Sequence, residues 1–109
     1  YGDHYKQNDK NDFENRVAKS SAFDPIGVKG SLLAMLGRND TTEYLDKINI
    51  PSLVICGEHD ALTPPPVMQS MAEKINGAEF VIIKNSGHMS PIENPLEVNK
   101  AINELLEKL

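Results

Sequence analysis

The sequence predicts an α/β fold, and two short apolar runs with a helical stretch between them carry this prediction. Residues 53–56 and 79–83 are rich in β-branched side chains and lack an alternating polar face, which is typical of strands buried on both faces of a parallel sheet. Between them, residues 64–75 place apolar side chains at helical spacing. A right-handed crossover would bring the carboxyl ends of both strands to one edge of the sheet.

Two chemically active side chains follow these strands. Asp60 comes just after the first strand, beyond the strand-breaking Gly57, and His88 lies in the loop of residues 84–91 after the second strand. Ligand sites of open α/β sheets lie at the carboxyl ends of the strands. An acid that orients an imidazole is one half of a Ser-His-Asp type site. We therefore expect Asp60 and His88 to lie close together.

The first forty residues carry weaker signals. Residues 1–12 are polar and have no apolar period, so we expect a loop or a poorly ordered terminus there. Residues 13–20 could form a short helix, because Phe13 and Val17 are spaced by one turn. Asp24 followed by Pro25 is typical of a helix start, and this helix is expected to end at Gly37.

Three further helices are expected around the strands. A short helix through Lys47 would be capped by Thr41 or Thr42, and the crossover helix would be capped by Thr63 and end at Asn76-Gly77. The final helix begins at Asn94 with Pro95 next, and Glu97 completes a capping-box pattern. The buried stripe of this last helix comprises Val98, Ala101, Ile102, Leu105, Leu106 and Leu109.

A family resemblance rests on two stretches of this region. The stretch Pro51-Ser-Leu-Val-Ile-Cys-Gly-Glu-His-Asp60, followed by Ser86-Gly-His-Met-Ser-Pro-Ile-Glu-Asn-Pro95, resembles the C-terminal third of an α/β-hydrolase. In that family the order along the chain is nucleophile, acid, histidine. The resemblance implies that Asp60 is the catalytic acid and His88 the catalytic histidine. Glu93 and Pro95 match the Glu-x-Pro at the start of the family's last helix.

The resemblance divides the chain into two parts. Residues 41–109 correspond to the C-terminal part of the hydrolase core, and residues 1–40 to the end of the cap or lid. Met35 or Leu36 could line the substrate pocket from that cap, although packing alone is the simpler interpretation. The chain starts at Tyr1 without an initiator methionine, so we expect a processed, trimmed or fragmentary protein. The expected object is a C-terminal fragment of the fold, with two parallel strands and flanking helices.

Other reactive side chains have simpler explanations. Ser86 is close to His88 but fits a loop residue better than a nucleophile. His59 is expected at a pocket rim or on the surface. Cys56 lies inside a buried strand, where a thiol is normally inert. Glu93 is expected to be structural at the start of the last helix, with a second acid role as the alternative.

The resemblance implies a cofactor-free enzyme that acts on a small-molecule ester, lactone or related bond. The chain has no G-x-S-x-G pattern for the nucleophile, so we expect the nucleophile to lie upstream and the isolated chain to be inactive. The histidines show no metal-ligand spacing, and we expect no metal. The alternatives are a dehalogenase or epoxide hydrolase, and a non-catalytic ligand-binding or regulatory protein with the same fold.

Composition excludes several classes of partner. The formal net charge of −5 disfavours nucleic acid, because no basic stripe can replace phosphate counterions. No apolar run approaches the ~18 residues that span a bilayer. The single cysteine excludes an internal disulfide and is compatible with the cytoplasm. Two strands cannot cover their own edges, so we expect homo-oligomers to form through the open sheet edge.

Overall fold

Two parallel strands form the centre of the structure, a computed structural model that describes residues 1–109. Strand β1 (Leu53–Gly57) pairs with β2 (Glu79–Ile83), with Leu53 opposite Glu79 and Gly57 opposite Ile83. Both strands were expected from their apolar runs, and β1 extends to Gly57. The predicted α/β class is therefore confirmed.

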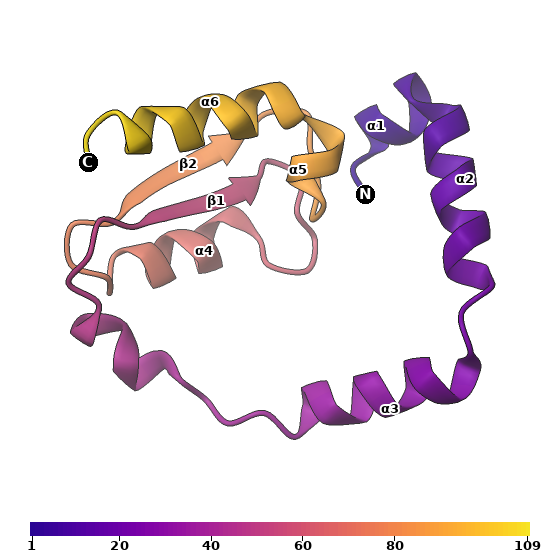
Figure 1. The fold of residues 1–109 in the computed structure, drawn as a ribbon, viewed down its shortest axis with the longest axis horizontal. Coiled ribbons are helices and arrows are strands. Elements are labelled where there is room, and N and C mark those ends of the chain that lie inside the picture. The colour runs from indigo at the N-terminus through magenta and orange to yellow at the C-terminus, as the bar shows by residue number, and fades with distance from the viewer.

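Two helices cover the faces of this small sheet. Helix α4 (Pro65–Ala72) packs against one face and α6 (Pro95–Leu106) against the other (Figure 1). Because each strand is covered on both sides, a continuous apolar run suits it better than an alternating one. The buried residues on the α4 side are Val54, Ala72 and Ile75, and α6 contributes Val98 and Ala101.

The crossover helix is shorter than expected. Helix α4 ends at Ala72, and the chain turns through Gly77 before it enters β2. Gly77 has a φ of +72°, a conformation that glycine adopts without steric cost. The prediction that Asn76-Gly77 ends the helix is therefore wrong, and Gly77 instead lies in the turn that leads into β2.

The cap predicted for α4 is wrong. Thr63 does not cap this helix; the N-cap position is Pro64, which has no side-chain cap bond. A capping side chain accepts hydrogen bonds from the amides two or three residues further on, and residues 64–66 are all proline. Thr63 would therefore find no N–H to accept, and its hydroxyl donates to Asp60 instead.

The N-terminal residues are helical, which corrects the expectation of a loop over residues 1–12. Helix α1 (Asp3–Asn8) and helix α2 (Lys10–Ser21) occupy this region. Tyr5 is buried and its ring stacks on that of Tyr1, while the Phe13 ring meets both edge-on. The Tyr5 hydroxyl donates to Asp12. This aromatic contact stabilises a segment whose sequence lacks an apolar period.

Helix α3 (Pro25–Leu36) begins and ends as expected. The Asp24 carboxylate accepts hydrogen bonds from the amides of Ile26 and Gly27, and Gly37 is the C-cap. No residue of α3 is buried. A helix that is apolar on all sides normally lies inside a larger structure. None of the helices is long and apolar enough to cross a bilayer.

The next helix, η1 (Thr42–Lys47), is a 3₁₀ helix. Its expected threonine cap is wrong, since Thr41 makes no side-chain cap bond. The Asp40 carboxylate instead accepts from the Thr42 amide at 2.8 Å and from its hydroxyl at 2.6 Å. A carboxylate is a stronger acceptor than a hydroxyl, which explains why Asp40 rather than a threonine accepts the hydrogen bonds at the start of η1.

A short helix α5 (Ser90–Glu93) precedes α6. Asn94 caps α6 as expected, and its side chain accepts from the Glu97 amide at 3.4 Å. Only this half of the expected capping box forms, because the Glu97 side chain is exposed and makes no return bond.

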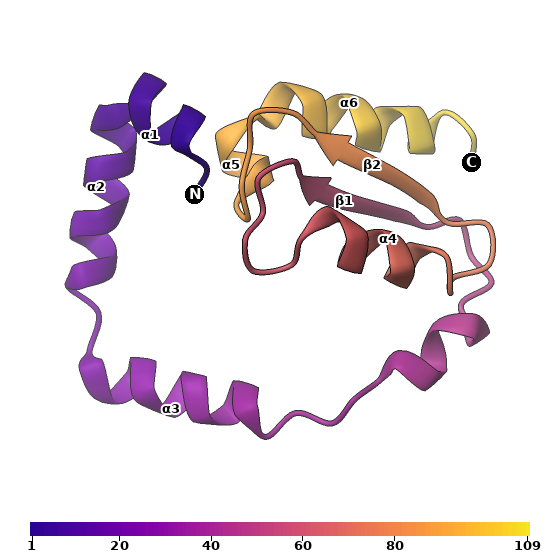
Figure 2. The same ribbon diagram turned by 180° about the vertical axis from the view of Figure 1, so that it is seen from behind.

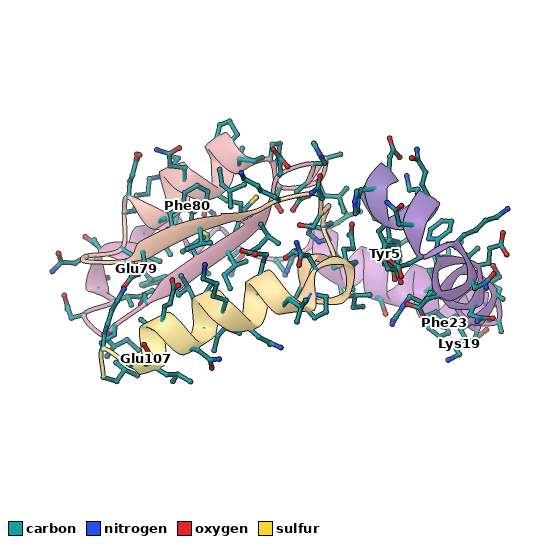
Figure 3. All side chains as sticks on the ribbon, turned by 90° about the horizontal axis from the view of Figure 1, so that it is seen from above. Tyr5, Lys19, Phe23, Glu79, Phe80 and Glu107 are labelled. Atoms are coloured by element: carbon teal, nitrogen blue, oxygen red, sulfur yellow. The ribbon has the colours of Figure 1, made fainter.

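The molecule is open rather than closely packed. Helices α1 to α3 curve away from the sheet and its covering helices (Figures 1 and 2), and Tyr5 and Phe23 lie far from Phe80 and Glu107 (Figure 3). The radius of gyration is 16.2 Å, against about 13 Å for a compact domain of this length. The accessible surface of 8049 Å² exceeds by roughly 2,000 Å² that of a compact monomer of the same mass.

Candidate functional site

The carboxylate of Asp60 is fixed by the turn that follows β1. The Asp60 amide donates to the carbonyl of Gly57 at 3.1 Å, which closes the turn. Oδ1 accepts from the amides of Leu62 at 2.9 Å and Thr63 at 3.0 Å, and Oδ2 accepts from the Thr63 hydroxyl at 2.8 Å. Three donors from one short loop therefore orient this side chain.

His88 reaches the same carboxylate from the loop after β2. Its Nδ1 lies 2.9 Å from Asp60 Oδ2, and the two side chains are 43% and 5% exposed, respectively. The Nε2 atom makes no hydrogen bond within the chain. The structure thus brings Asp60 and His88 together, with the acid buried and the far side of the imidazole ring open.

The surroundings favour one tautomer of His88. Thr63 Oγ1 uses its only proton toward Asp60, and this oxygen lies 3.4 Å from His88 Nδ1. Both neighbours of Nδ1 can then act only as acceptors, which places the ring proton on Nδ1. The lone pair of Nε2 remains available to accept a proton.

The pKa of Asp60 is lowered from 3.8 to about 2. Burial alone would raise it, but hydrogen bonds from the Thr63 amide, from His88, from the Thr63 hydroxyl and from the Leu62 amide outweigh that effect. The carboxyl group is consequently ionised at neutral pH, as required of an acceptor that stabilises a charged imidazole.

Glycine allows the two loops to cross at close range. A Cβ atom on Gly57 would lie 2.1 Å from the carbonyl oxygen of Gly87 and 2.7 Å from that of Ser86. The amide of His59 donates to the Ser86 carbonyl at 2.8 Å, and the Asn85 amide to the Glu58 carboxylate at 3.0 Å. The acid loop and the histidine loop therefore form one hydrogen-bonded unit.

The remaining candidates lie outside the pair. Ser86 is fully buried, and its hydroxyl donates to the Ile83 carbonyl at 3.0 Å. His59 is exposed beside a hollow of about 360 Å³ next to the N-terminal residues. Cys56 is buried, and burial, followed by the negative charge of Asp60, raises the pKa of its thiol. Met35 and Leu36 lie exposed on α3, and their contribution to a pocket stays a prediction.

Glu93 bonds to backbone amides on both sides of His88 and not to Asp60, which agrees with a structural interpretation. No group of three His, Cys, Asp or Glu side chains is placed to hold a metal ion.

The site residue that was not predicted from the sequence is Thr63. Its position three residues after Asp60 was a local signal, but the prolines behind it suggested a helix cap.

Comparisons with known proteins identify the family of this fold. A model of the alpha/beta hydrolase fold matches residues 1–95. A thermophilic esterase from Thermogutta terrifontis is 42% identical with a TM-score of 0.67, over 70% of this chain and 28% of the esterase.

Two curated relatives match over similar regions. A proline iminopeptidase of Saccharolobus solfataricus is 34% identical over 70 residues, which is 64% of this chain and 22% of the peptidase. A pimeloyl-[acyl-carrier protein] methyl ester esterase of Neisseria meningitidis is 33% identical over 51 residues, 47% of this chain and 20% of the esterase.

The chain spans about a fifth of the length of these two curated relatives. The family model covers most of the chain. The chain therefore belongs to the α/β-hydrolase fold family.

Proposed function

We propose that this chain supplies the acid and the general base of a hydrolase that cleaves a small-molecule ester, lactone or related bond. The observation that carries the proposal is the 2.9 Å contact between His88 Nδ1 and the buried carboxylate of Asp60, with Nε2 left open. Support also comes from relatives named as esterases.

In this proposal Nε2 of His88 accepts the proton of a serine hydroxyl as the serine oxygen attacks the substrate carbonyl. Asp60 stabilises the imidazolium that forms, through its bond to Nδ1–H. The imidazolium then donates its proton to the leaving alcohol as the acyl–oxygen bond breaks. A water molecule repeats the sequence on the acyl-enzyme, with His88 again as base and then acid.

The serine of this reaction is expected to come from outside the 109 residues. Ser86 does not qualify, because it is fully buried and its proton is used by the Ile83 carbonyl. We therefore expect the isolated chain to hydrolyse p-nitrophenyl acetate no faster than free imidazole. Turnover above that rate would contradict this assignment of the nucleophile.

The test joins this chain to the remainder of the Thermogutta terrifontis esterase in place of that enzyme's matching segment. We expect the hybrid to hydrolyse p-nitrophenyl esters, and Asp60→Asn and His88→Ala each to lower kcat by about 10²- to 10⁴-fold. His59→Ala, which changes an exposed neighbour of the acid, is the matched control and should keep the activity. Full activity of both site variants would overturn the proposal.

A further inference from the structure

A second carboxylate, that of Glu93, is buried beside the histidine loop. Its residue is 8% exposed, and no lysine, arginine or histidine forms an ion pair with it. The carboxylate instead accepts hydrogen bonds from three backbone amides. A buried carboxylate without a cation requires such donors. The three amides therefore take the place of a cationic partner for Glu93.

Two of the three amides flank His88 directly. Glu93 Oε2 accepts from the Gly87 amide at 2.8 Å, and Oε1 accepts from the Met89 amide at 3.0 Å. One oxygen is used on each side, so the carboxylate fixes the backbone immediately before and after the histidine. That backbone sets the direction in which the Cα–Cβ bond of His88 leaves the loop, and the bond to Asp60 then orients the ring.

The third amide comes from the other end of the chain. The Gly2 amide donates to Glu93 Oε2 at 2.7 Å, and the N-terminus lies beside α5 in both ribbon views (Figures 1 and 2). The backbones of Gly2 and Gly87 are in close contact, since a Cβ on Gly87 would lie 2.5 Å from the Gly2 nitrogen. The same carboxylate therefore ties the first residues to the histidine loop.

We infer that Glu93 is the positioning residue that holds His88 in register with Asp60, and that it links this alignment to the docking of the N-terminal segment. The catalytic part of the inference rests on the proposed function. Glu93 touches neither substrate nor reacting atoms; it acts through the amides of Gly87 and Met89. A displacement of about 1 Å at a reacting group can cost about a hundredfold in rate, so loosening this loop has a large kinetic effect.

The first test needs no activity and uses the 109-residue chain. In the unmodified ¹⁵N-labelled chain, the amide protons of Gly87 and Met89 are expected to exchange slowly with solvent. In Glu93→Gln and in Glu93→Asp, their proton signals are expected to shift upfield. The downfield proton signal of His88 Nδ1–H should weaken in both variants. Glu97→Gln, an exposed glutamate in the next helix, is the matched control and should leave all three signals in place.

Rapid exchange of the Gly87 and Met89 amides in the unmodified chain would overturn the inference without any variant. It would also fail if these signals in Glu93→Gln and Glu93→Asp matched those of Glu97→Gln. Glu93→Asp retains the negative charge but is one methylene shorter. If Glu93→Gln does not fold, Glu93→Asp therefore tests whether the carboxylate must reach the amides of Gly87 and Met89.

The second test uses the hybrid enzyme. Glu93→Gln should lower kcat about tenfold to a hundredfold while KM stays within about twofold, whereas partial unfolding would lower only the amount of active enzyme found by active-site titration. An inactive unmodified hybrid would count against the proposed function and leave the amide test valid. An active hybrid that tolerates Glu93→Gln would contradict only the positioning role of Glu93.

Discussion

Residues 41–109 and residues 1–40 differ in what their apolar side chains contact. In the first region β1 and β2 are covered by α4 and α6, and nearly all buried residues of the molecule lie there. In the second region only Gly2 and Tyr5 are buried, and α2 and α3 bury none of their residues. Both regions nevertheless form regular helices with well-defined ends.

The difference separates local structure from packing. Helix α3 owes its ends to Asp24 and Gly37, which are local signals, but caps and propensity alone give short helices little stability in water. Its apolar surface is left uncovered in this chain. The division of the chain into a cap end over residues 1–40 and a core over residues 41–109 remains a prediction. It can be tested by comparing the effects of substitutions in the two regions.

The largest contrast is expected from glycine-to-alanine changes in the two regions. Gly57→Ala places a Cβ 2.1 Å from the Gly87 carbonyl oxygen, which forces the acid and histidine loops apart and should lower the free energy of unfolding by about 3 kcal/mol. Gly30→Ala in α3 meets no atom within 4 Å and should raise helix stability by about 0.5–1 kcal/mol. Urea unfolding of both variants measures the pair. Equal effects would show that the loops are not in close contact.

The second prediction concerns pH and Asp60. The pKa of this carboxyl group falls from 3.8 to about 2 on folding, so its ionised form stabilises the folded chain by roughly 2 kcal/mol. That contribution is complete above about pH 4 and is lost as the pH falls toward 2, because the unfolded chain then binds the proton more tightly. Urea unfolding at pH 5 and pH 2.5 should show the loss.

Asp60→Asn removes the group that titrates and is the control for this measurement. The variant should be less stable at pH 5, and its stability should fall less steeply toward pH 2.5. An unchanged slope in the variant would assign the acid sensitivity to other carboxyl groups.

The strands and the paired side chains could be predicted because their signals are local. A run such as residues 79–83 is typical of a strand in a parallel sheet, and the position of His88 just after it follows from the end of the strand. The helix ends at Asp24 and Asn94 were likewise predicted from neighbouring residues. At these helix ends the decisive interaction lies within a few positions along the chain, whereas Asp60 and His88 are brought together by the crossover between the parallel strands.

The features that were missed depend on residues distant in sequence or on competition between partners. Helix α1 is held by an aromatic contact that has no periodic signature. Glu93 receives the Gly2 amide from the opposite end of the chain, which no local pattern indicates. Thr63 could cap α4 or bond to Asp60. The prolines after it offer no amide donors for a cap, so its hydroxyl bonds to Asp60.

The third prediction asks which region drives self-association. We propose that the isolated chain forms oligomers through its open strand edges, because the excess surface of roughly 2,000 Å² is comparable to that of a specific interface. Ile82→Lys on β2, at a position that is partly exposed, should weaken association about tenfold by placing a charge on the strand. Light scattering after size exclusion, over a range of concentrations, measures it.

Deletion of residues 1–40 distinguishes the two regions. If the sheet edge drives association, the shortened chain still associates and Ile82→Lys still weakens it. A shortened chain that is monomeric would assign the association to α3 and its neighbours instead. A monodisperse monomer of the full 109 residues at high concentration would contradict the proposal for either region.

The smallest effect comes from the same substitution made once in each region. Ile83 at the end of β2 is 1% exposed and Ile26 at the start of α3 is 81% exposed. Ile83→Val should lower the free energy of unfolding by about 1 kcal/mol, because the lost methyl group leaves a cavity, whereas Ile26→Val should change it by less than about 0.5 kcal/mol. In the hybrid enzyme, however, Ile26→Val should become as costly as Ile83→Val if α3 is buried there. A cost at Ile26 that is equally small in both proteins would mean that this apolar helix faces solvent or substrate rather than the hydrolase core.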